Sequence, residues 1–456
     1  MKPRRRRGLP PYTDYLVSRC ASLYLLFPRT SLYSMSAGRP GYVDTVVSLL
    51  AAHYILVYAA RAARSLVVEM HRVLSSTEVA ESYSPAGYLD VAASARSLMR
   101  LGPPVWRRVK RGPAPVDRLC LCGLFARILS AAEKLSENTG RVYDHMRSVY
   151  GVDVEGSRPL RRLRRRAERA REDLARMALR ECGRLAAAGT SVCRDAFTRR
   201  GGRLSRYFNI LVDIVASLEK AVEEGRVDLD IRARGAEAGQ AARKLALRMA
   251  VERLYELYTL YIVLRALSRL GEVRSEDSTI LVEFGKGIRV FYNSRPKAGD
   301  KPLSRVALGE SDHLDDGDLE RLSGIPDITL VINNRVKVVI EVKHSYNIGY
   351  LALARFKTIA YIHEYDADAG ILVYPGLSHT RKRGQARGML DEEYEATRTV
   401  LERAETRGHA TIRLRDNASL YIMPLIPEEK REQDNVDKMY KVLNSIIREA
   451  DASGLA

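Results

Sequence analysis

Two carboxylates and a lysine lie at the ends of two neighbouring apolar runs, around a short polar turn. Asp327 begins the first run, and Glu341 and Lys343 end the second. Asn333-Asn334 between the runs is typical of a tight hairpin turn, so we expect two antiparallel strands that bring Asp327 and Glu341 to the same end. Residues i and i+2 of a strand point to the same side, so Glu341 and Lys343 should share a face.

The carboxylates of Asp327 and Glu341 would repel each other at this end of the hairpin unless a cation lay between them. Mg²⁺ binds carboxylate oxygens and keeps several waters, and a lysine beside it can orient or activate a water for attack on phosphorus. The alternative is a surface hairpin that carries charge without a function. The residues around Glu341 oppose this alternative, because they indicate a buried strand in which an unpaired glutamate would be costly. They are Val338, Val339, Ile340 and Val342.

The elements that must hold these residues form a mixed α/β pattern at about 246–427. Helical periodicity predicts a long apolar helix at Leu247–Leu270 and another helix at about Tyr350–Tyr365. The strands expected around them are Thr279–Phe284, Ile288–Tyr292, Ile328–Ile332, Val336–Val342 and Ala369–Tyr374. This order predicts a central mixed sheet with helices, followed by a C-terminal helix within 428–456.

At these residues the sequence resembles the PD-(D/E)XK nuclease superfamily. Pro326-Asp327 and Glu341-Val342-Lys343 match its bipartite motif, and the order of helix, strands, helix and strand is similar. Other features resemble the McrC-like restriction-endonuclease branch. They are Leu254-Tyr255-Glu256-Leu257-Tyr258, Phe291-Tyr292-Asn293 and Leu372-Val373-Tyr374-Pro375-Gly376. The resemblance covers about residues 246–427.

The resemblance implies a restriction-endonuclease-like fold and a nuclease that uses Mg²⁺ or Mn²⁺. It implies that Asp327 and Glu341 hold the metal and that Lys343 positions the attacking water. Glu256 on the first helix would complete the catalytic site. The alternative for Glu256 is a structural residue that is hydrogen-bonded in the core, and Glu252, one turn earlier, is then the other candidate.

The charge of the chain is concentrated in its first half. The 456 residues carry a formal net charge of +19, and 46% hydrophobic residues with 29% charged residues exclude wholesale disorder. Residues 1–250 hold 45 Lys and Arg against 24 Asp and Glu, a net +21, and the remainder is near −2. We expect residues 1–245 to be an all-helical, basic region that binds a polyanion, with nucleic acid before an anionic membrane.

Basic residues at three places are candidates for phosphate contacts. The first is a helix that begins near Pro159, where so many like charges repel each other unless an anion is present; the alternative is a solvated helix face. The second is Lys357, on the helix after the motif, where the resemblance implies a polar residue that touches the phosphate; the alternative is an amphipathic surface. The third is a basic loop after the last core strand, and the alternative is a loop that is merely solvated. The residues of the helix and the loop are Arg161, Arg162, Arg164, Arg165, Arg166, Arg381, Lys382 and Arg383.

The cysteines and the apolar segments indicate in which cellular environment the protein is expected. A four-thiolate zinc site can be imagined among Cys120, Cys122, Cys182 and Cys193, but the spacings are wrong for zinc knuckles, and we expect buried free thiols. The most apolar segment, Val46–Ala60, is shorter than the roughly 20 residues of a membrane span, so we expect a buried helix and a cytoplasmic protein without a membrane partner.

These observations predict a metal-dependent endonuclease that acts on nucleic acid, with double-stranded DNA as the first expectation. The resemblance implies restriction or defence as its setting. The sequence has no P-loop, so any nucleotide-driven motor would be a separate NTPase subunit. A homodimer is a further expectation. The alternatives are a non-catalytic nucleic-acid-binding protein and a DNA-repair nuclease of the same fold.

Overall fold

The computed structural model divides the chain into two units. The first unit comprises residues 1–51, 139–161 and 224–456, and the second comprises 52–138 and 162–223. The residues that the structure describes are 10, 12–27, 42–73, 75–81, 88–100, 102–111, 115–150, 158–182, 193, 197, 202–225, 240–276, 279–283, 287–296, 323–377, 391–414 and 417–453.

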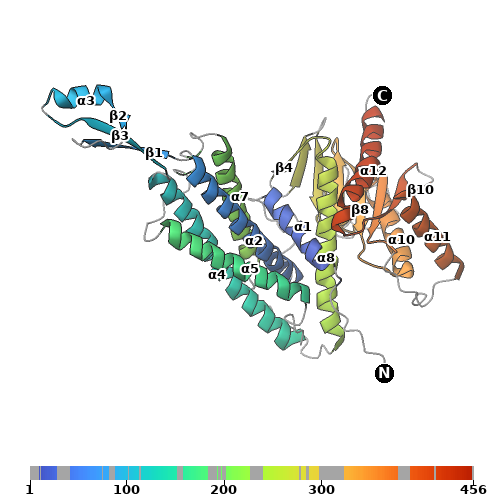
Figure 1. Cartoon of the computed structure of the whole chain (residues 1–456). Coiled ribbons are helices and arrows are strands. Elements are labelled where there is room, and N and C mark those ends of the chain that lie inside the picture. Colours follow the sequence, from blue (N-terminus) through green and yellow to red (C-terminus); the bar gives the residue numbers. More distant parts are fainter. Residues whose placement is uncertain are drawn as a thin grey trace, which may run out of the picture. The chain divides into compact units, whose positions relative to one another are not determined.

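The first unit is built on one mixed sheet of eight strands (Figure 1). The strands are β4 (Glu272–Glu276), β5 (Thr279–Glu283), β6 (Ile288–Tyr292), β7 (Ile328–Ile332), β8 (Arg335–Val342), β9 (Ala369–Tyr374), β10 (Ala410–Arg413) and β11 (Ser419–Pro424). Their spatial order is β10-β11-β9-β8-β7-β6-β5-β4. Strand β8 pairs antiparallel with β7 and parallel with β9. The expected mixed sheet is therefore confirmed, and β4, β10 and β11 extend it beyond the five strands expected.

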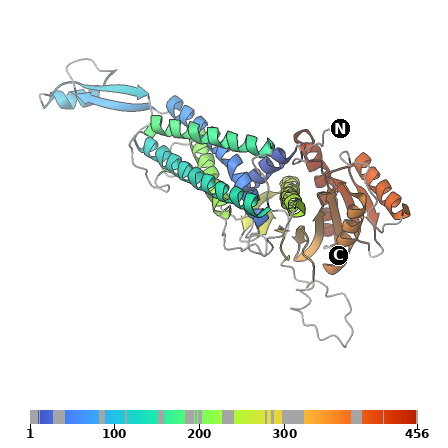
Figure 2. The same ribbon diagram turned by 90° about the horizontal axis from the view of Figure 1, so that it is seen from below.

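Helices cover both faces of this sheet (Figure 2). Val339 of β8 belongs to a buried cluster with residues of α10 (Ile348–Glu364) and α11 (Asp391–Arg407). Ile340, which is equally buried, points to the opposite face. On that face α8 (Gln240–Leu267) and α12 (Glu432–Ser453) contact β8, and the short 3₁₀ helix η1 (Glu429–Arg431) leads into α12. The end of β8 is thus a buried position.

The hairpin between β7 and β8 contains the expected turn and one unexpected irregularity. Asn333 and Asn334 both have positive φ, 52° and 63°, which is the conformation of a type I′ turn. Val331 then pairs with Val336, whereas Leu330 pairs with Val338. Lys337 is therefore an extra residue on β8, a β-bulge that shifts the register of the remaining pairs by one.

An N-terminal helix, α1 (Thr13–Leu26), belongs to the same unit as the sheet, although the sequence placed it in a separate region of 1–245. Helix α1 packs against α8. The Tyr12 hydroxyl lies 2.7 Å from Nε2 of His344, directly after the motif, and Arg19 Nε lies 2.6 Å from a carboxylate oxygen of Glu432. These partners are hundreds of residues apart, and no spacing in the sequence indicates them.

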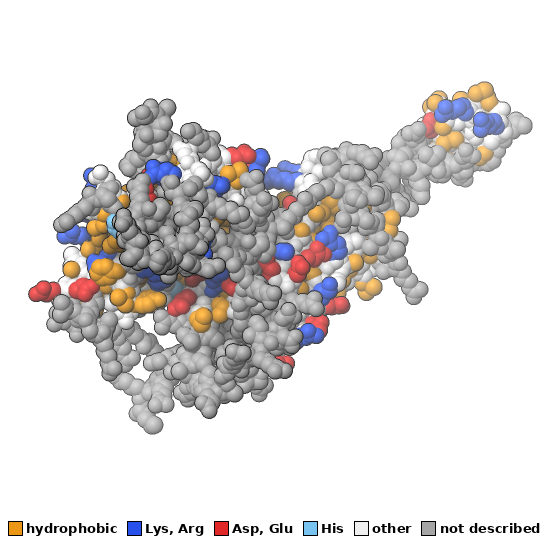
Figure 3. Space-filling view, turned by 180° about the vertical axis from the view of Figure 1, so that it is seen from behind, with side chains coloured by type: hydrophobic (Ala, Val, Ile, Leu, Met, Phe, Trp, Pro, Cys, Tyr) orange, Lys and Arg blue, Asp and Glu red, His pale blue; other side chains and the backbone are white. Residues whose placement is uncertain are grey.

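The second unit contains long helices and a small sheet. The helices that run through it are α2 (Tyr42–Val73), α4 (Pro115–Tyr150), α5 (Arg158–Cys182) and α7 (Gly202–Glu224). The expectation of an all-helical region is wrong for Ser75–Arg111. There, β1 (Ser75–Glu81) and β2 (Tyr88–Leu89) pair antiparallel with β3 (Val105–Arg111), beside α3 (Val91–Leu98). Figure 3 shows hydrophobic and basic side chains next to each other on the α3 segment.

Helix α2 contains the segment that the sequence placed in a buried helix. Among the described residues, Val43–Arg72 is the one helix that is long and apolar enough to cross a membrane, and 72% of its most apolar window is buried in the protein. The core helix of a folded unit passes the same test, so this segment is weak evidence for a membrane span.

The cysteines of the second unit form two disulfides, which corrects the expectation of free thiols. Cys120 pairs with Cys193, and Cys122 pairs with Cys182. Cys120 and Cys122 are two residues apart on α4, so their side chains diverge and cannot share one metal ion. Each instead meets a partner whose Cα lies 5.3 or 5.6 Å away, within the range of a disulfide. The sequence could not supply this connectivity.

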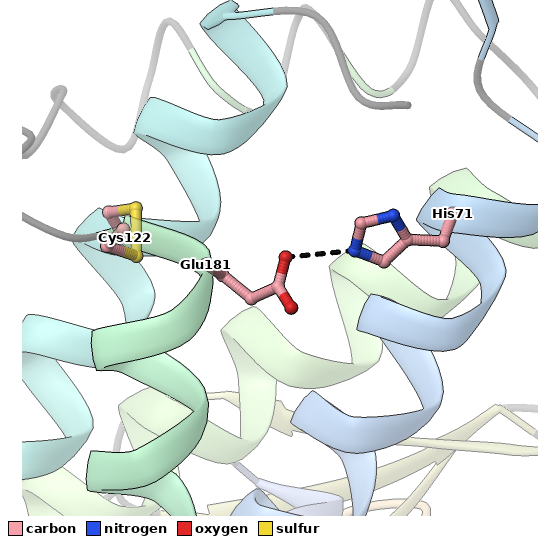
Figure 4. The surroundings of a disulfide bond; sticks show 4 residues. His71, Cys122 and Glu181 are labelled. Carbon is pink, nitrogen blue, oxygen red and sulfur yellow. Dashed lines mark hydrogen bonds and ion pairs between the residues drawn. A yellow bond between two sulfur atoms is a disulfide. The ribbon is translucent and has the colours of Figure 1, made fainter. Parts of the chain in front are cut away.

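An ion pair lies beside the second disulfide (Figure 4). Nε2 of His71 on α2 lies 2.9 Å from Oε2 of Glu181, the neighbour of Cys182 on α5. Burial would raise the pKa of Glu181, but hydrogen bonds from His71 and Arg180 lower it below its ordinary value. The disulfide and the ion pair together fix the end of α5.

We expect disulfide mapping by mass spectrometry under non-reducing conditions to recover Cys120–Cys193 and Cys122–Cys182, with Cys20 free. The bonds close loops with sequence separations of 73 and 60 residues, and each loop constrains the unfolded chain by about 4 kcal/mol in the chain-entropy model. Reduction should therefore lower the melting temperature, whereas Cys20→Ser should leave the effect of reductant unchanged. Alkylation of all five thiols in denaturant without reductant would contradict the pairing.

Candidate active site

The β-bulge in the β7–β8 hairpin sets the two carboxylates opposite each other. Ile328 pairs with Ile340, so the next positions of the antiparallel pair are Asp327 and Glu341. Without the extra residue, Asp327 would lie opposite Ile340, and Glu341 would be displaced by one position. The main-chain N–H of Val342 donates a hydrogen bond of 2.6 Å to Oδ2 of Asp327, which fixes this carboxylate at the end of β8.

Glu341 lies at the centre of the candidate site and is fully buried. Its Oε1 lies 2.5 Å from Nζ of Lys343 and 2.9 Å from Nζ of Lys357. Its Oε2 is buried and has no hydrogen-bond partner among the residues that the structure describes. The expected juxtaposition of Glu341 and Lys343 is confirmed, and Lys357 joins them from α10. A carboxylate with one unpartnered buried oxygen has a free position for a ligand.

Asp327 is in an environment that disfavours its charge. Its residue exposure is only 9%. Burial, the Glu341 carboxylate and the Glu256 carboxylate together raise the pKa of Asp327 well above its ordinary value, against the opposing effect of Lys343. The negative charge at this end of the sheet is therefore only partly compensated by protein groups.

Lys343 remains positively charged in this environment. Burial would lower the pKa of its ammonium group, but Glu341 and Asp327 raise it above the ordinary value of lysine. Lys357 follows the same pattern: burial opposes its charge, and Glu341 raises its pKa. Both side chains are therefore hydrogen-bond donors at neutral pH and have no free electron pair with which to accept a proton.

Glu256 on α8 lies near the pair but has partners of its own. Its Oε2 accepts hydrogen bonds of 2.7 Å from Arg253 and 3.3 Å from the side-chain amide of Asn293. Arg253 also donates to Asp44 at 2.8 Å. The main-chain N–H of Asn293 donates 2.9 Å to the carbonyl oxygen of Asp327. Arg253 and Asn293 thus link Glu256 to the Asp327 segment, and their spacing in the sequence does not indicate this.

The segment that precedes Asp327 is held against α10. A Cβ atom on Gly324 would lie 2.3 Å from Cε1 of Tyr361, so only glycine permits this close approach. Glu364 accepts a hydrogen bond of 3.0 Å from the Gly324 N–H, and the Tyr365 hydroxyl donates 2.5 Å to the Gly324 carbonyl. Tyr361 donates 2.9 Å to the carbonyl of Ile325. The helix that carries Lys357 therefore also positions the Asp327 segment.

The donor set fits a hard divalent cation with few protein ligands. Within the described part of the chain, no group of three or more His, Cys, Asp and Glu side chains gathers as a complete metal site. Mg²⁺, however, is commonly bound through one or two carboxylates, with waters and substrate phosphates in the other positions. Asp327 and Glu341 supply two carboxylates, and no donor in the described part of the chain is hydrogen-bonded to Oε2 of Glu341.

The arginines of α5 form the exposed face of an amphipathic helix in the second unit. The side of α5 that packs inside the unit is apolar and includes Leu163, Ala167 and Leu174. The exposed side carries Arg161, Arg162, Arg164, Arg165 and Arg166. Nε of Arg164 lies 2.9 Å from Oε1 of Glu168. The remaining basic candidates, Arg381, Lys382 and Arg383, lie outside the described residues.

We expect Asp327→Asn to raise the melting temperature at neutral pH, because it removes a buried charge whose pKa is raised in the folded state. Such a carboxyl group contributes its full stabilisation at a pH below the pKa that it has in the unfolded chain. This contribution is lost as the pH rises through the higher pKa that it has in the folded protein. The gain should therefore disappear towards pH 3, with a shift of roughly 2–4 °C for each kcal/mol relieved. Mg²⁺ should raise the melting temperature of the wild type more than that of the variant. A variant that is equally or less stable at pH 7 and more stable at pH 3 would contradict the assignment.

Matches to known proteins are weak. No family model matches the chain. No curated protein matches it either. Among solved structures, the chain is similar to a chain of a refined half-complex from a tetradecameric assembly of Thermococcus gammatolerans McrB AAA+ hexamers with bound McrC. The match has 11% sequence identity and a TM-score of 0.27, and it covers 96% of this chain and 78% of that chain. A TM-score this low supports no conclusion about the fold family or the function of this chain.

Proposed function

We propose that this chain is a metal-dependent nuclease of the PD-(D/E)XK type that hydrolyses phosphodiester bonds of nucleic acid, with DNA as the substrate. One observation carries the proposal. Asp327, Glu341 and Lys343 meet at one end of a central hairpin, and the buried Oε2 of Glu341 has no hydrogen-bond partner within the described ranges of the chain. The motif residues Pro326-Asp327 and Glu341-Val342-Lys343 that resemble the superfamily are the same residues.

In this proposal Asp327 and Glu341 would hold Mg²⁺ or Mn²⁺, which when bound would lower the pKa of a coordinated water and neutralise charge on the phosphate. Lys343 would donate hydrogen bonds that orient the attacking water and offset the negative charge that develops on phosphorus-bound oxygen. Lys357, whose side chain is 46% exposed, would contact a phosphate oxygen of the strand. Glu256 would act from α8, through its effect on Asp327 or through a water.

A non-catalytic nucleic-acid-binding protein is the second candidate. Such a protein does not need two carboxylates buried side by side. Burial and the Glu341 carboxylate raise the pKa of Asp327, so the charged form of Asp327 is disfavoured in the fold. Destabilised buried charges of this kind are typical of functional sites, although structural networks also produce them. The site therefore supports the nuclease over the binding protein, and the same site would serve a repair nuclease.

The proposal extends to the basic half of the chain. The exposed arginines of α5 would bind backbone phosphates of the nucleic acid without reading its bases. The resemblance to the McrC-like branch further suggests a separate NTPase subunit as a partner and a role in restriction or defence, in the cytoplasm. Two disulfides are unusual for a cytosolic protein. Disulfide mapping therefore also tests the proposed cytoplasmic location.

We expect Asp327→Ala and Glu341→Ala each to abolish Mg²⁺-dependent cleavage of plasmid DNA, because each removes one of two carboxylate ligands. Lys343→Ala should lose cleavage and retain most nucleic-acid and metal binding, since it removes one charge among 75 basic residues. The control is Lys430→Ala, which removes an exposed lysine outside the hairpin that pairs with Glu428 at 3.4 Å. Cleavage at the wild-type rate by any of the first three variants would remove that residue from the mechanism.

The arginines of α5 should set the salt dependence of binding. Replacing Arg161, Arg162, Arg164, Arg165 and Arg166 with glutamine keeps good helix formers and removes the charges that would neutralise phosphates. The slope of log affinity against log salt should flatten by about one unit for each phosphate that is no longer neutralised, equally for all DNA sequences. Replacement of the exposed Arg403 and Arg407 on α11 is the control. An unchanged slope would show that α5 is a solvated face or binds protein. The full chain is needed, because a fragment from residue 246 would lack α1.

A further inference from the structure

The outward face of α10 exposes three large apolar side chains and no carboxylate. The exposed positions of this helix are Tyr350, Leu353, Phe356, Lys357, Ala360 and His363. Tyr350, Leu353 and Phe356 are 41%, 63% and 52% exposed. They follow one another at intervals of three residues, which places them along one side of the helix. None of the six exposed residues is a carboxylate. We call Tyr350, Leu353, Phe356 and Lys357 the α10 face.

A neighbouring helix on the same side of the sheet has a different exposed surface. Helix α11 packs on the same side of the sheet, and its exposed positions include Glu395, Arg398 and Glu402, which form ion pairs with one another. That is the usual polar surface of an amphipathic helix. Contiguous exposed apolar side chains of the α10 kind mark binding surfaces in soluble proteins.

The α10 face is continuous with the candidate active site. Nζ of Lys357 lies 2.9 Å from Oε1 of Glu341. Ile325, another exposed apolar residue, lies two positions before Asp327, and its carbonyl is bound by Tyr361 of α10. A strand whose phosphate reached Asp327 and Glu341 would therefore have its adjacent nucleotides over α10.

The chemistry of the α10 face is that of a cationic aromatic surface. The Arg355 guanidinium lies 4.7 Å from the centre of the Phe356 ring, so an aromatic ring and a planar cation are already stacked there. Single-stranded nucleic acid is bound in this way elsewhere: bases stack on aromatic side chains, and basic groups follow the backbone. In duplex DNA the faces of the bases are covered by their neighbours and cannot reach such a surface.

We propose that the α10 face binds unpaired bases next to the scissile phosphate, so that the substrate is nucleic acid with a single-stranded segment at the cut site. This inference rests on the proposed nuclease function and refines its substrate. A second copy of the chain fits the face less well, because the face carries the ammonium group of Lys357 and none of the six exposed residues of α10 is a carboxylate that could pair with it. Phosphates beside stacked bases supply the complementary negative charge.

The test is the affinity of the full-length protein for a short labelled single strand and for the matching duplex, measured by fluorescence anisotropy in EDTA. Phe356→Ala and Leu353→Ala should each weaken single-strand binding roughly fivefold or more, the lower end of what one stacked base contributes, and change duplex binding less than twofold. This weakening should be the same at every salt concentration, because stacking releases no counterions. Val68→Ala, on a 61% exposed apolar side chain of α2, is the matched control.

Phe356→Trp distinguishes a loss of base stacking from a loss of folding, because tryptophan can also stack on a base. It should retain single-strand affinity and gain tryptophan fluorescence that the single strand quenches. The inference is overturned if Phe356→Ala and Leu353→Ala bind the single strand within twofold of the wild type, or if they lose duplex binding equally. It is also overturned if the wild type sediments as a dimer that Phe356→Ala converts to a monomer. Mg²⁺-dependent cleavage by the wild type, measured separately, shows whether the nuclease function stands when this inference fails.

Discussion

The enforced proximity of Asp327 and Glu341 is the constraint on which the rest of the first unit depends. Two buried carboxylates at the end of one hairpin repel each other, and burial adds to the cost of charging Asp327. Lys343 and Lys357 offset part of this charge at Oε1 of Glu341. The physical basis for proposing a divalent cation is this remaining negative charge together with Oε2 of Glu341, to which no described residue is hydrogen-bonded.

The surrounding elements maintain this unfavourable arrangement. The extra residue Lys337 shifts the register so that Glu341, and not Ile340, lies opposite Asp327. Helix α10 holds Gly324 and Ile325 through three side chains and contributes Lys357. From the opposite layer, α8 contributes Glu256, which Arg253 and Asn293 keep in place. Elements on both faces of the sheet therefore keep the two carboxylates together.

Much of the hairpin and its charges could be predicted from the sequence, because the signals are local. The runs Ile288–Tyr292, Ile328–Ile332 and Ala369–Tyr374 form strands with the expected bounds, and Asn333-Asn334 forms the expected turn. The alternation of side chains along a strand was enough to predict that Lys343 lies beside Glu341. In the sequence, Glu341 lies one residue farther from the Asn333-Asn334 turn than Asp327 does. The β-bulge accounts for this difference.

Other features depend on partners that are distant in the sequence or on weak local signals. The contacts of Arg253 with Asp44, of Lys357 with Glu341 and of Tyr12 with His344 join separate elements, so spacing does not indicate them. Strand β1 reads Ser-Ser-Thr-Glu-Val-Ala-Glu and lacks the apolar alternation of a half-buried strand. The disulfide partners of Cys120 and Cys122 depend on how the helices pack, which composition does not encode.

The most direct test of the central claim is a crystal of the full-length protein soaked in Mn²⁺ and measured for anomalous scattering of the metal. A nuclease site predicts an anomalous peak within direct coordination distance of Oε2 of Glu341 and of the Asp327 carboxylate, and no such peak in crystals of Asp327→Asn. A saturated crystal with no peak at these carboxylates, or with an unchanged peak in the variant, would contradict the assignment of this site to metal-dependent chemistry.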